Sequence, residues 1–179
     1  KCCRASRAIA RLARREGLHR TELLLWLARC QRRLGRLDQA TRIYQAAARR
    51  SDPAPRARLG LSEVNLQRGQ LGPALQHALA AADALTSGIH PVGLRADVGV
   101  QLARCYRRGD ALGAAIAELQ EVLELTPGHF GANLELGQIY ASLNKHRRSI
   151  RHLRRALDGR SGSRAARREL KRVCQDLAS

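Results

Sequence analysis

A repeat of 34 residues is the feature that most constrains the fold of this chain. A leucine followed by a small residue recurs at Leu27-Ala28, Leu61-Ser62, Leu102-Ala103 and Leu136-Gly137, at intervals of 34, 41 and 34 residues. Two further columns keep the same frame: Ala40, Ala74, Ala115 and Ser149, and then Tyr44, Ala78, Leu119 and Leu153. Agreement among independent columns indicates a tandem structural repeat.

Each repeat is predicted to contain two amphipathic helices. In the first half of a repeat, apolar residues recur at i, i+4 and i+7, as in Leu23, Leu27 and Cys30. This spacing forms one face of an α-helix, and the second half keeps a similar stripe. Between the halves stand residues that favour the left-handed conformation at a helix C-terminus, namely Gly35, Gly69, Gly109 and Asn144. The unit is therefore a helix-turn-helix.

The frame predicts one domain over residues 1–179. It comprises a second helix at 5–17, four full repeats at 21–54, 55–88, 96–129 and 130–163, and an unpaired capping helix at 164–177. The 41-residue interval holds seven extra residues, so we expect a longer helix beside the breaker-rich segment 86–93. Because the chain lacks an initiator Met and opens within a repeat, we also expect a fragment or a processed product.

The period and its columns resemble the tetratricopeptide repeat (TPR) family from about residue 5 to residue 177. The matching positions are Tyr106, Tyr140 and Gly137 in first helices, Tyr44, Ala40, Ala74 and Ala115 in second helices, and Pro127 at a repeat end. The sequence departs from the family pattern at Gln31 and Asn65, where a first-helix aromatic is usual, and at Ala78. The resemblance implies an all-α fold, a right-handed α-solenoid of helix-turn-helix repeats with about ten helices. It does not identify a subfamily.

The resemblance also suggests a binding surface, because the first helices of TPR proteins line a concave groove that binds peptides or partner helices. Carried over column by column, the groove positions include Arg29, Arg32, Arg33, Arg104, Arg107 and Arg108, and the final helix adds Arg168 and Arg172. Guanidinium groups recognise carboxylates and phosphates. We therefore expect a protein or peptide partner with acidic or phosphorylated groups. The alternative is that these arginines are solvated surface residues without a binding role.

The charge distribution leaves a second function open. The net charge of +18 divides into +12 for residues 1–60, −3 for 61–144 and +9 for 145–179. Five arginines lie off the core stripe of a second helix, at positions 147, 148, 151, 154 and 155. Such a face is either solvated or binds nucleic acid or an anionic membrane. The single Phe and three Tyr provide few aromatic platforms for stacking bases, which disfavours nucleic acid.

The sequence contains no pattern typical of an enzyme. Motifs of the form GxxxxGKS/T, HExxH, GxSxG and GxGxxG are absent, and the six histidines lack metal-ligand spacing. We therefore expect no catalytic activity, no metal, no cofactor and no small-molecule substrate. The longest apolar run, from Leu23 to Ala28, is too short to span a membrane.

Five cysteines without a CxxC pair favour the cytoplasm or another reducing compartment. Cys30, Cys105 and Cys174 are predicted to be buried, reduced and structural. The adjacent Cys2 and Cys3, which precede a basic stretch, are also compatible with lipidation.

Overall fold

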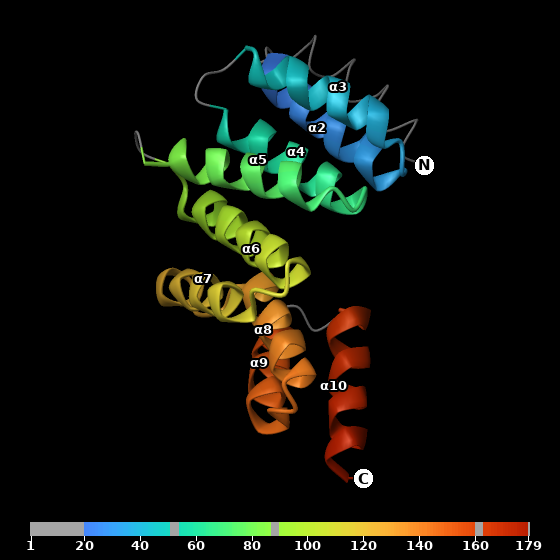
Figure 1. Ribbon diagram of the computed structural model, residues 1–179, viewed down its shortest axis with the longest axis vertical. Coiled ribbons are helices and arrows are strands. Elements are labelled where there is room, and N and C mark those ends of the chain that lie inside the picture. Colours follow the sequence, from blue (N-terminus) through green and yellow to red (C-terminus); the bar gives the residue numbers. More distant parts are fainter. Residues whose placement is uncertain (1–19, 51–53, 87–89, 160–162, 179) are drawn as a thin grey trace. The chain divides into compact units, whose positions relative to one another are not determined.

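The computed structural model describes residues 20–50, 54–86, 90–159 and 163–178, and within these ranges it contains nine α-helices and no strand (Figure 1). Each helix packs most extensively on a chain neighbour, so that α2 pairs with α3, α4 with α5, α6 with α7 and α8 with α9. This arrangement confirms the prediction of helix-turn-helix repeats. The expected helix at 5–17 lies outside the described residues.

The chain divides into two compact units, residues 1–89 and residues 90–179. The first unit contains α2 (Arg20–Arg33), α3 (Leu37–Ala48), α4 (Pro55–Gln67) and α5 (Leu71–Asp83). The second contains α6 (Val92–Arg108), α7 (Leu112–Leu125), α8 (Phe130–Ser142), α9 (His146–Gly159) and α10 (Arg164–Ala178). The helix α6 has 17 residues, whereas α4 and α8 have 13 each, so α6 is the longer helix expected beside the insertion.

The repeat columns form the cores of both units. The small residues Ala40, Ala74, Ala115 and Ser149 are all 0% exposed, and so are Ala78, Leu119 and Leu153. Small residues at these positions allow paired helices to approach closely. At Gly137 the helices approach so closely that a Cβ there would lie 2.6 Å from Cγ of Leu153. The Ser149 hydroxyl adds a hydrogen bond by donating to the Gly137 carbonyl at 2.7 Å.

Three of the four predicted turn residues adopt the left-handed conformation, with φ of 74° at Gly35, 77° at Gly69 and 56° at Asn144. The prediction was wrong at Gly109, whose φ is −89°. Its N–H instead donates to the Cys105 carbonyl and continues the helical pattern. The left-handed residue is Asp110, with φ of 60°. Asp110 occupies the same position in its repeat as the left-handed residues of the other three turns.

The three described cysteines differ in burial. Cys105 is buried as predicted, Cys30 is half-buried, and Cys174 is exposed. The prediction for Cys174 was therefore wrong. The core of α10 consists of Ala166 and Val173, both 0% exposed, while Cys174 occupies the column of Tyr106 and Tyr140. Tyr140 of that column stacks on His152 of the following helix, α9, whereas no described helix follows α10.

Candidate functional site

The first-helix arginines of the N-terminal unit lie on the last turns of α2. Arg32 forms an ion pair with Glu63 of α4, with 3.0 Å between Nη2 and Oε2, and its side chain is 18% exposed. The Arg32 side chain also hydrogen-bonds Tyr44 of α3. Burial raises the pKa of the Tyr44 phenol, and the nearby Glu63 carboxylate raises it further, so Tyr44 stays neutral. Arg32 therefore connects three helices of this unit.

The other two predicted arginines of α2, Arg29 and Arg33, are exposed. The Arg29 guanidinium lies 5.5 Å from the ring centroid of Trp26 and forms a cation–π contact with it. The two residues are about one helical turn apart. Trp26 is itself 55% exposed. Arg33 is exposed and forms no ion pair with any described residue.

A second arginine cluster occurs in the C-terminal unit between α6 and α8. Nε of Arg104 donates to Oε1 of Glu135 at 2.7 Å, and Nη2 of Arg107 lies 2.9 Å from Oε2 of the same carboxylate. The Glu135 side chain is 6% exposed, whereas the two arginine side chains are about one third exposed. A carboxylate so deeply buried requires this pairing, because an unpaired buried charge is strongly unfavourable.

The remaining predicted arginines lie on the surface of the C-terminal unit. Arg108 and Arg168 are exposed and form no ion pair within the described part of the chain. Arg172 is exposed and pairs with Glu169 within α10. The structure thus places Arg29, Arg32 and Arg33 on one helix, α2, with different contacts, and brings Arg104 and Arg107 together around Glu135.

The sequence reasoning missed the acidic partners of these arginines. A signal was present, because the segment Ala-Arg-Cys-x-Arg-Arg occurs at 28–33 and again at 103–108, in equivalent positions of the first and third repeats. In both copies the fifth residue, Arg32 or Arg107, pairs with a glutamate on the first helix of the following repeat. The two glutamates stand at different positions of their repeats. A column-by-column comparison of the repeats therefore does not show that both arginines have an acidic partner.

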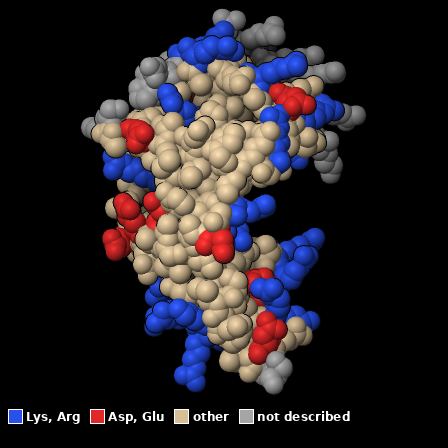
Figure 2. All heavy atoms as spheres, in the orientation of Figure 1, with Lys and Arg blue, Asp and Glu red and all other residues tan. Residues whose placement is uncertain are grey.

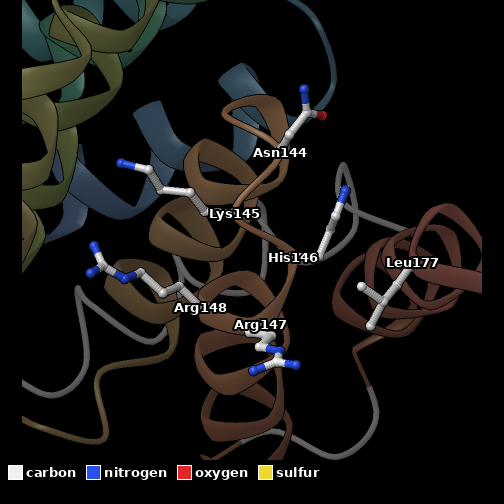
Figure 3. Close-up of a pocket in the computed structure, with 6 residues that line it drawn as sticks. All are labelled: Asn144, Lys145, His146, Arg147, Arg148 and Leu177. Carbon is white, nitrogen blue, oxygen red and sulfur yellow. The ribbon is translucent and has the colours of Figure 1, made fainter.

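A different basic surface covers the outer side of α9. Arg147, Arg148, Arg151, Arg154 and Arg155 are all exposed, and Figure 2 shows positive side chains gathered over the region of α9 and α10. A shallow cavity of about 320 Å³ lies beside the start of α9 and is lined by Lys145, His146, Arg147, Arg148, Asn144 and Leu177. In Figure 3 Lys145 and Arg148 point to one side, while His146 and Arg147 point elsewhere. The cavity therefore does not gather its polar groups around one ligand.

The described residues contain no group of three or more His, Cys, Asp or Glu side chains placed to hold a metal ion. In the same residues, no helix has both the length and the apolar character needed to cross a membrane. One histidine lies near an acidic side chain: Nε2 of His129 is 3.7 Å from Oδ1 of Asp97. Its Nδ1 accepts a hydrogen bond from the Ala132 N–H and caps α8.

Comparison with known proteins identifies similar folds. A family model described as tetratricopeptide repeat matches residues 3–53, 31–89 and 106–166. One chain in the crystal structure of the APC/C hetero-tetramer Cut9–Hcn1 is similar with a TM-score of 0.78 and 21% identity, over 94% of this chain and 32% of that chain. This chain therefore spans about a third of that protein.

Two smaller proteins are also similar in structure. The TPR protein TTC0263 of Thermus thermophilus aligns with a TM-score of 0.77 and 19% identity, over 96% of this chain and 89% of that chain. YrrB, a TPR protein with an unusual peptide-binding site, aligns with a TM-score of 0.60 and 18% identity, over 95% and 84% of the two chains. A search of curated proteins found no match to the sequence.

Proposed function

Because this chain belongs to the tetratricopeptide repeat family, we propose that it is a non-enzymatic scaffold that binds another protein through the first helices of its repeats. The finer part of the proposal is the chemistry of the partner, which carries carboxylate or phosphate groups. Proteins of this family are typically scaffolds without catalytic activity. YrrB, a protein of similar fold, has a peptide-binding site.

The observation that carries this proposal is the repeated arginine segment. In each copy one arginine is fixed by a glutamate of the next repeat, Arg32 by Glu63 and Arg107 by Glu135. The residue that follows each of them, Arg33 or Arg108, is exposed and unpaired among the described residues. An arginine held on a rigid helix and free of internal partners can form charge-assisted hydrogen bonds with a ligand.

The second candidate function is binding of nucleic acid or an anionic membrane through the outer face of α9. The five exposed arginines of that helix favour it. Contacts of this kind depend on charge and weaken steeply with salt. The two functions use different surfaces, so paired substitutions can separate them.

The test compares two double variants with the same change in net charge. Arg33→Glu with Arg108→Glu reverses the first-helix arginines, whereas Arg151→Glu with Arg155→Glu reverses two on α9. Binding is measured by fluorescence anisotropy with a set of labelled acidic and phosphorylated 15-residue peptides, and with a labelled single-stranded DNA and anionic vesicles. We expect the first variant to weaken binding of the best peptide at least tenfold, while the second leaves it within about twofold, because each reversal replaces attraction with repulsion.

The matched charge makes the comparison decisive. General attraction between an acidic peptide and a chain of net charge +18 would fall equally in both variants. Equal loss in the two variants would therefore contradict the first-helix site. Loss of DNA or vesicle binding only in the α9 variant, with no peptide bound by either protein, would favour the second candidate.

A further inference from the structure

The five exposed arginines of α9, which we call the arginine face, form two rows along the helix. Arg147 and Arg154 are seven residues apart and make one row, and Arg148 and Arg155 make the other. Seven residues are nearly two helical turns, so the members of a row point to the same side, and the rows are separated by roughly 100° around the helix. Arg151 lies between them. In Figure 3 Arg147 and Arg148, one from each row, point in different directions.

The arginine face has little compensating charge. Within the described part of the chain none of its five residues forms an ion pair, and the only acidic residue of α9 is Asp158. Arg151 has an arginine at each of the positions three and four residues before and after it, and like charges at this spacing repel. A ligand with closely spaced negative charges would relieve this repulsion.

The exposure of this face is a property of the repeat. The equivalent positions of α7 are 113, 114, 117, 120 and 121, and all five are exposed although α7 packs on α6 and α8. On α3, α5 and α7 these positions carry small, neutral or acidic residues, with Arg42 as the only basic residue. The fold therefore does not require arginine there, and we interpret the five arginines of α9 as a binding feature.

The apolar residues of α9 argue against a membrane as the ligand. Leu153 and Ala156 are 0% exposed, and Ile150 packs against the same core as Leu153. No apolar side chain lies between the two arginine rows. A helix that binds a membrane surface normally inserts apolar side chains, which this face does not offer. Two rows that diverge around a helix also cannot both lie on a flat surface.

Single-stranded nucleic acid is also a poor match, because proteins that bind it stack its bases on aromatic rings. Tyr140, the aromatic residue beside α9, is 6% exposed and its ring already stacks on His152. A DNA duplex instead presents phosphates in two strands on either side of a groove. The major groove is about 12 Å wide, which is close to the diameter of a helix with its side chains. Each arginine row can then contact one strand through charge-assisted hydrogen bonds.

We propose that the arginine face of α9 binds the phosphate backbone of double-stranded DNA without reading its sequence. One row contacts each strand, and Arg151 lies over the groove between them. The inference rests on the second candidate function and names its ligand. It does not involve the first-helix arginines, so the same chain can also bind a protein partner.

The test compares the binding of five probes to the full chain at one salt concentration. Fluorescence anisotropy follows a labelled DNA duplex of about 20 base pairs, one of its strands alone, an RNA duplex of the same sequence and an acidic peptide, and co-sedimentation follows vesicles that contain phosphatidylserine. We expect the DNA duplex to bind at least about fivefold more tightly than each of the other nucleic acids and to bind without detectable vesicle binding. Titrations at several salt concentrations give the salt dependence of the affinity.

Three double variants each remove two exposed arginines that are seven residues apart in a second helix or directly after it. They are Arg147→Gln with Arg154→Gln, Arg148→Gln with Arg155→Gln, and the control Arg42→Gln with Arg49→Gln at α3. Loss of either row should weaken duplex binding at least about tenfold and reduce the slope of log K against log salt by about two, since each phosphate contact contributes about 0.9. The control should leave the affinity within about twofold.

The single variant Arg151→Gln separates binding from folding. It should weaken duplex binding, whereas its urea midpoint should not fall, because the substitution relieves repulsion among five like charges. A lower midpoint together with weaker binding would assign the loss to unfolding and contradict the proposal.

Other outcomes would also overturn the inference. Equal losses in the α3 control would show that only overall charge matters, and a loss from one row alone would contradict contact with two strands. Equal binding of the single strand, the RNA duplex or the vesicles would reject duplex DNA as the ligand while preserving the second candidate function. Binding of the acidic peptide alone would reject both of these and leave the first-helix proposal intact.

Discussion

Single side chains set how closely the helices of this protein approach one another. The Tyr44 ring occupies the space where Gly60 lacks a side chain, and Leu153 does the same at Gly137. A glycine in a helix is intrinsically unfavourable by about 1 kcal/mol relative to alanine. The close ring contact and the burial that it allows offset this cost.

His152 of α9 illustrates how one half-buried group couples stability to pH. Its Nδ1 lies 3.0 Å from Oδ1 of Asn133, and its ring stacks on Tyr140 with a centroid separation of 5.6 Å. The Asn133 amide nitrogen already donates to the Pro127 and His129 carbonyls, so Nδ1 of His152 is the donor toward Oδ1. Burial lowers the pKa of His152, and the neighbouring Arg155 and Arg151 lower it further.

We predict that the protein loses stability as the pH falls below about 6.5, the ordinary pKa of histidine. The unfolded chain binds the proton on His152 more tightly than the folded protein does. Stability is therefore fully present above the unfolded pKa and is lost as the pH falls toward the folded one. The limit is about 1.4 kcal/mol per pH unit for one histidine.

Urea unfolding between about pH 7.5 and 5.5 checks this prediction, with His152→Gln as the comparison. The variant should show a shallower loss of stability. It should not abolish the loss, because burial and Arg58 also lower the pKa of His77. An unchanged slope in His152→Gln would show that other groups cause the pH dependence.

At the scale of the helix, ion pairs between first helices join neighbouring repeats in addition to their apolar contacts. The pairs Arg32–Glu63 and Arg107–Glu135 lie beside cores made largely of Ala, Leu and Val. Because the glutamate in the second pair is buried and its arginines are partly exposed, the carboxylate is the member whose loss matters most.

We expect Glu135→Gln to lower the free energy of unfolding by about 1–3 kcal/mol, because two arginines would then face a neutral amide. Urea denaturation followed by circular dichroism measures the change. Glu121→Gln, on the exposed side of α7, is the matched control and should change stability by less than about 0.5 kcal/mol. Similar effects of both substitutions would show that the Glu135 pairs contribute little.

The limits of sequence reasoning also become clear at this scale. Periodicity predicted the helix pairs and the buried columns, because both depend on local spacing. It could not predict the pairing of Arg107 with Glu135, which depends on side-chain reach between two repeats. It misplaced one turn because Gly109 seemed the natural left-handed residue beside Asp110, and it misjudged Cys174 because burial there requires a following helix. The binding roles of the eight arginines stay predictions.

At the scale of the whole molecule, the repeat frame predicts that the two units belong to a single solenoid domain. In repeat proteins each repeat is stabilised by its neighbours. A substitution that destabilises one repeat therefore lowers the stability of the whole array when the repeats unfold cooperatively. The two units have separate compact cores, and the tryptophan lies only in the first. Trp26 emission therefore follows the first unit, whereas circular dichroism follows all helices.

The last prediction uses this difference. Gly137→Ala should destabilise the second unit by about 1–3 kcal/mol, since the new Cβ would lie 2.6 Å from Cγ of Leu153, and Gly113→Ala is the control because nothing lies within 4 Å of its Cβ position. If residues 1–179 form one cooperative domain, Gly137→Ala should lower the urea midpoint of Trp26 emission as much as that of circular dichroism. If instead the Trp26 midpoint stays at its wild-type value while the circular dichroism curve shows an additional transition at lower urea concentration, the repeats form two independently folding domains.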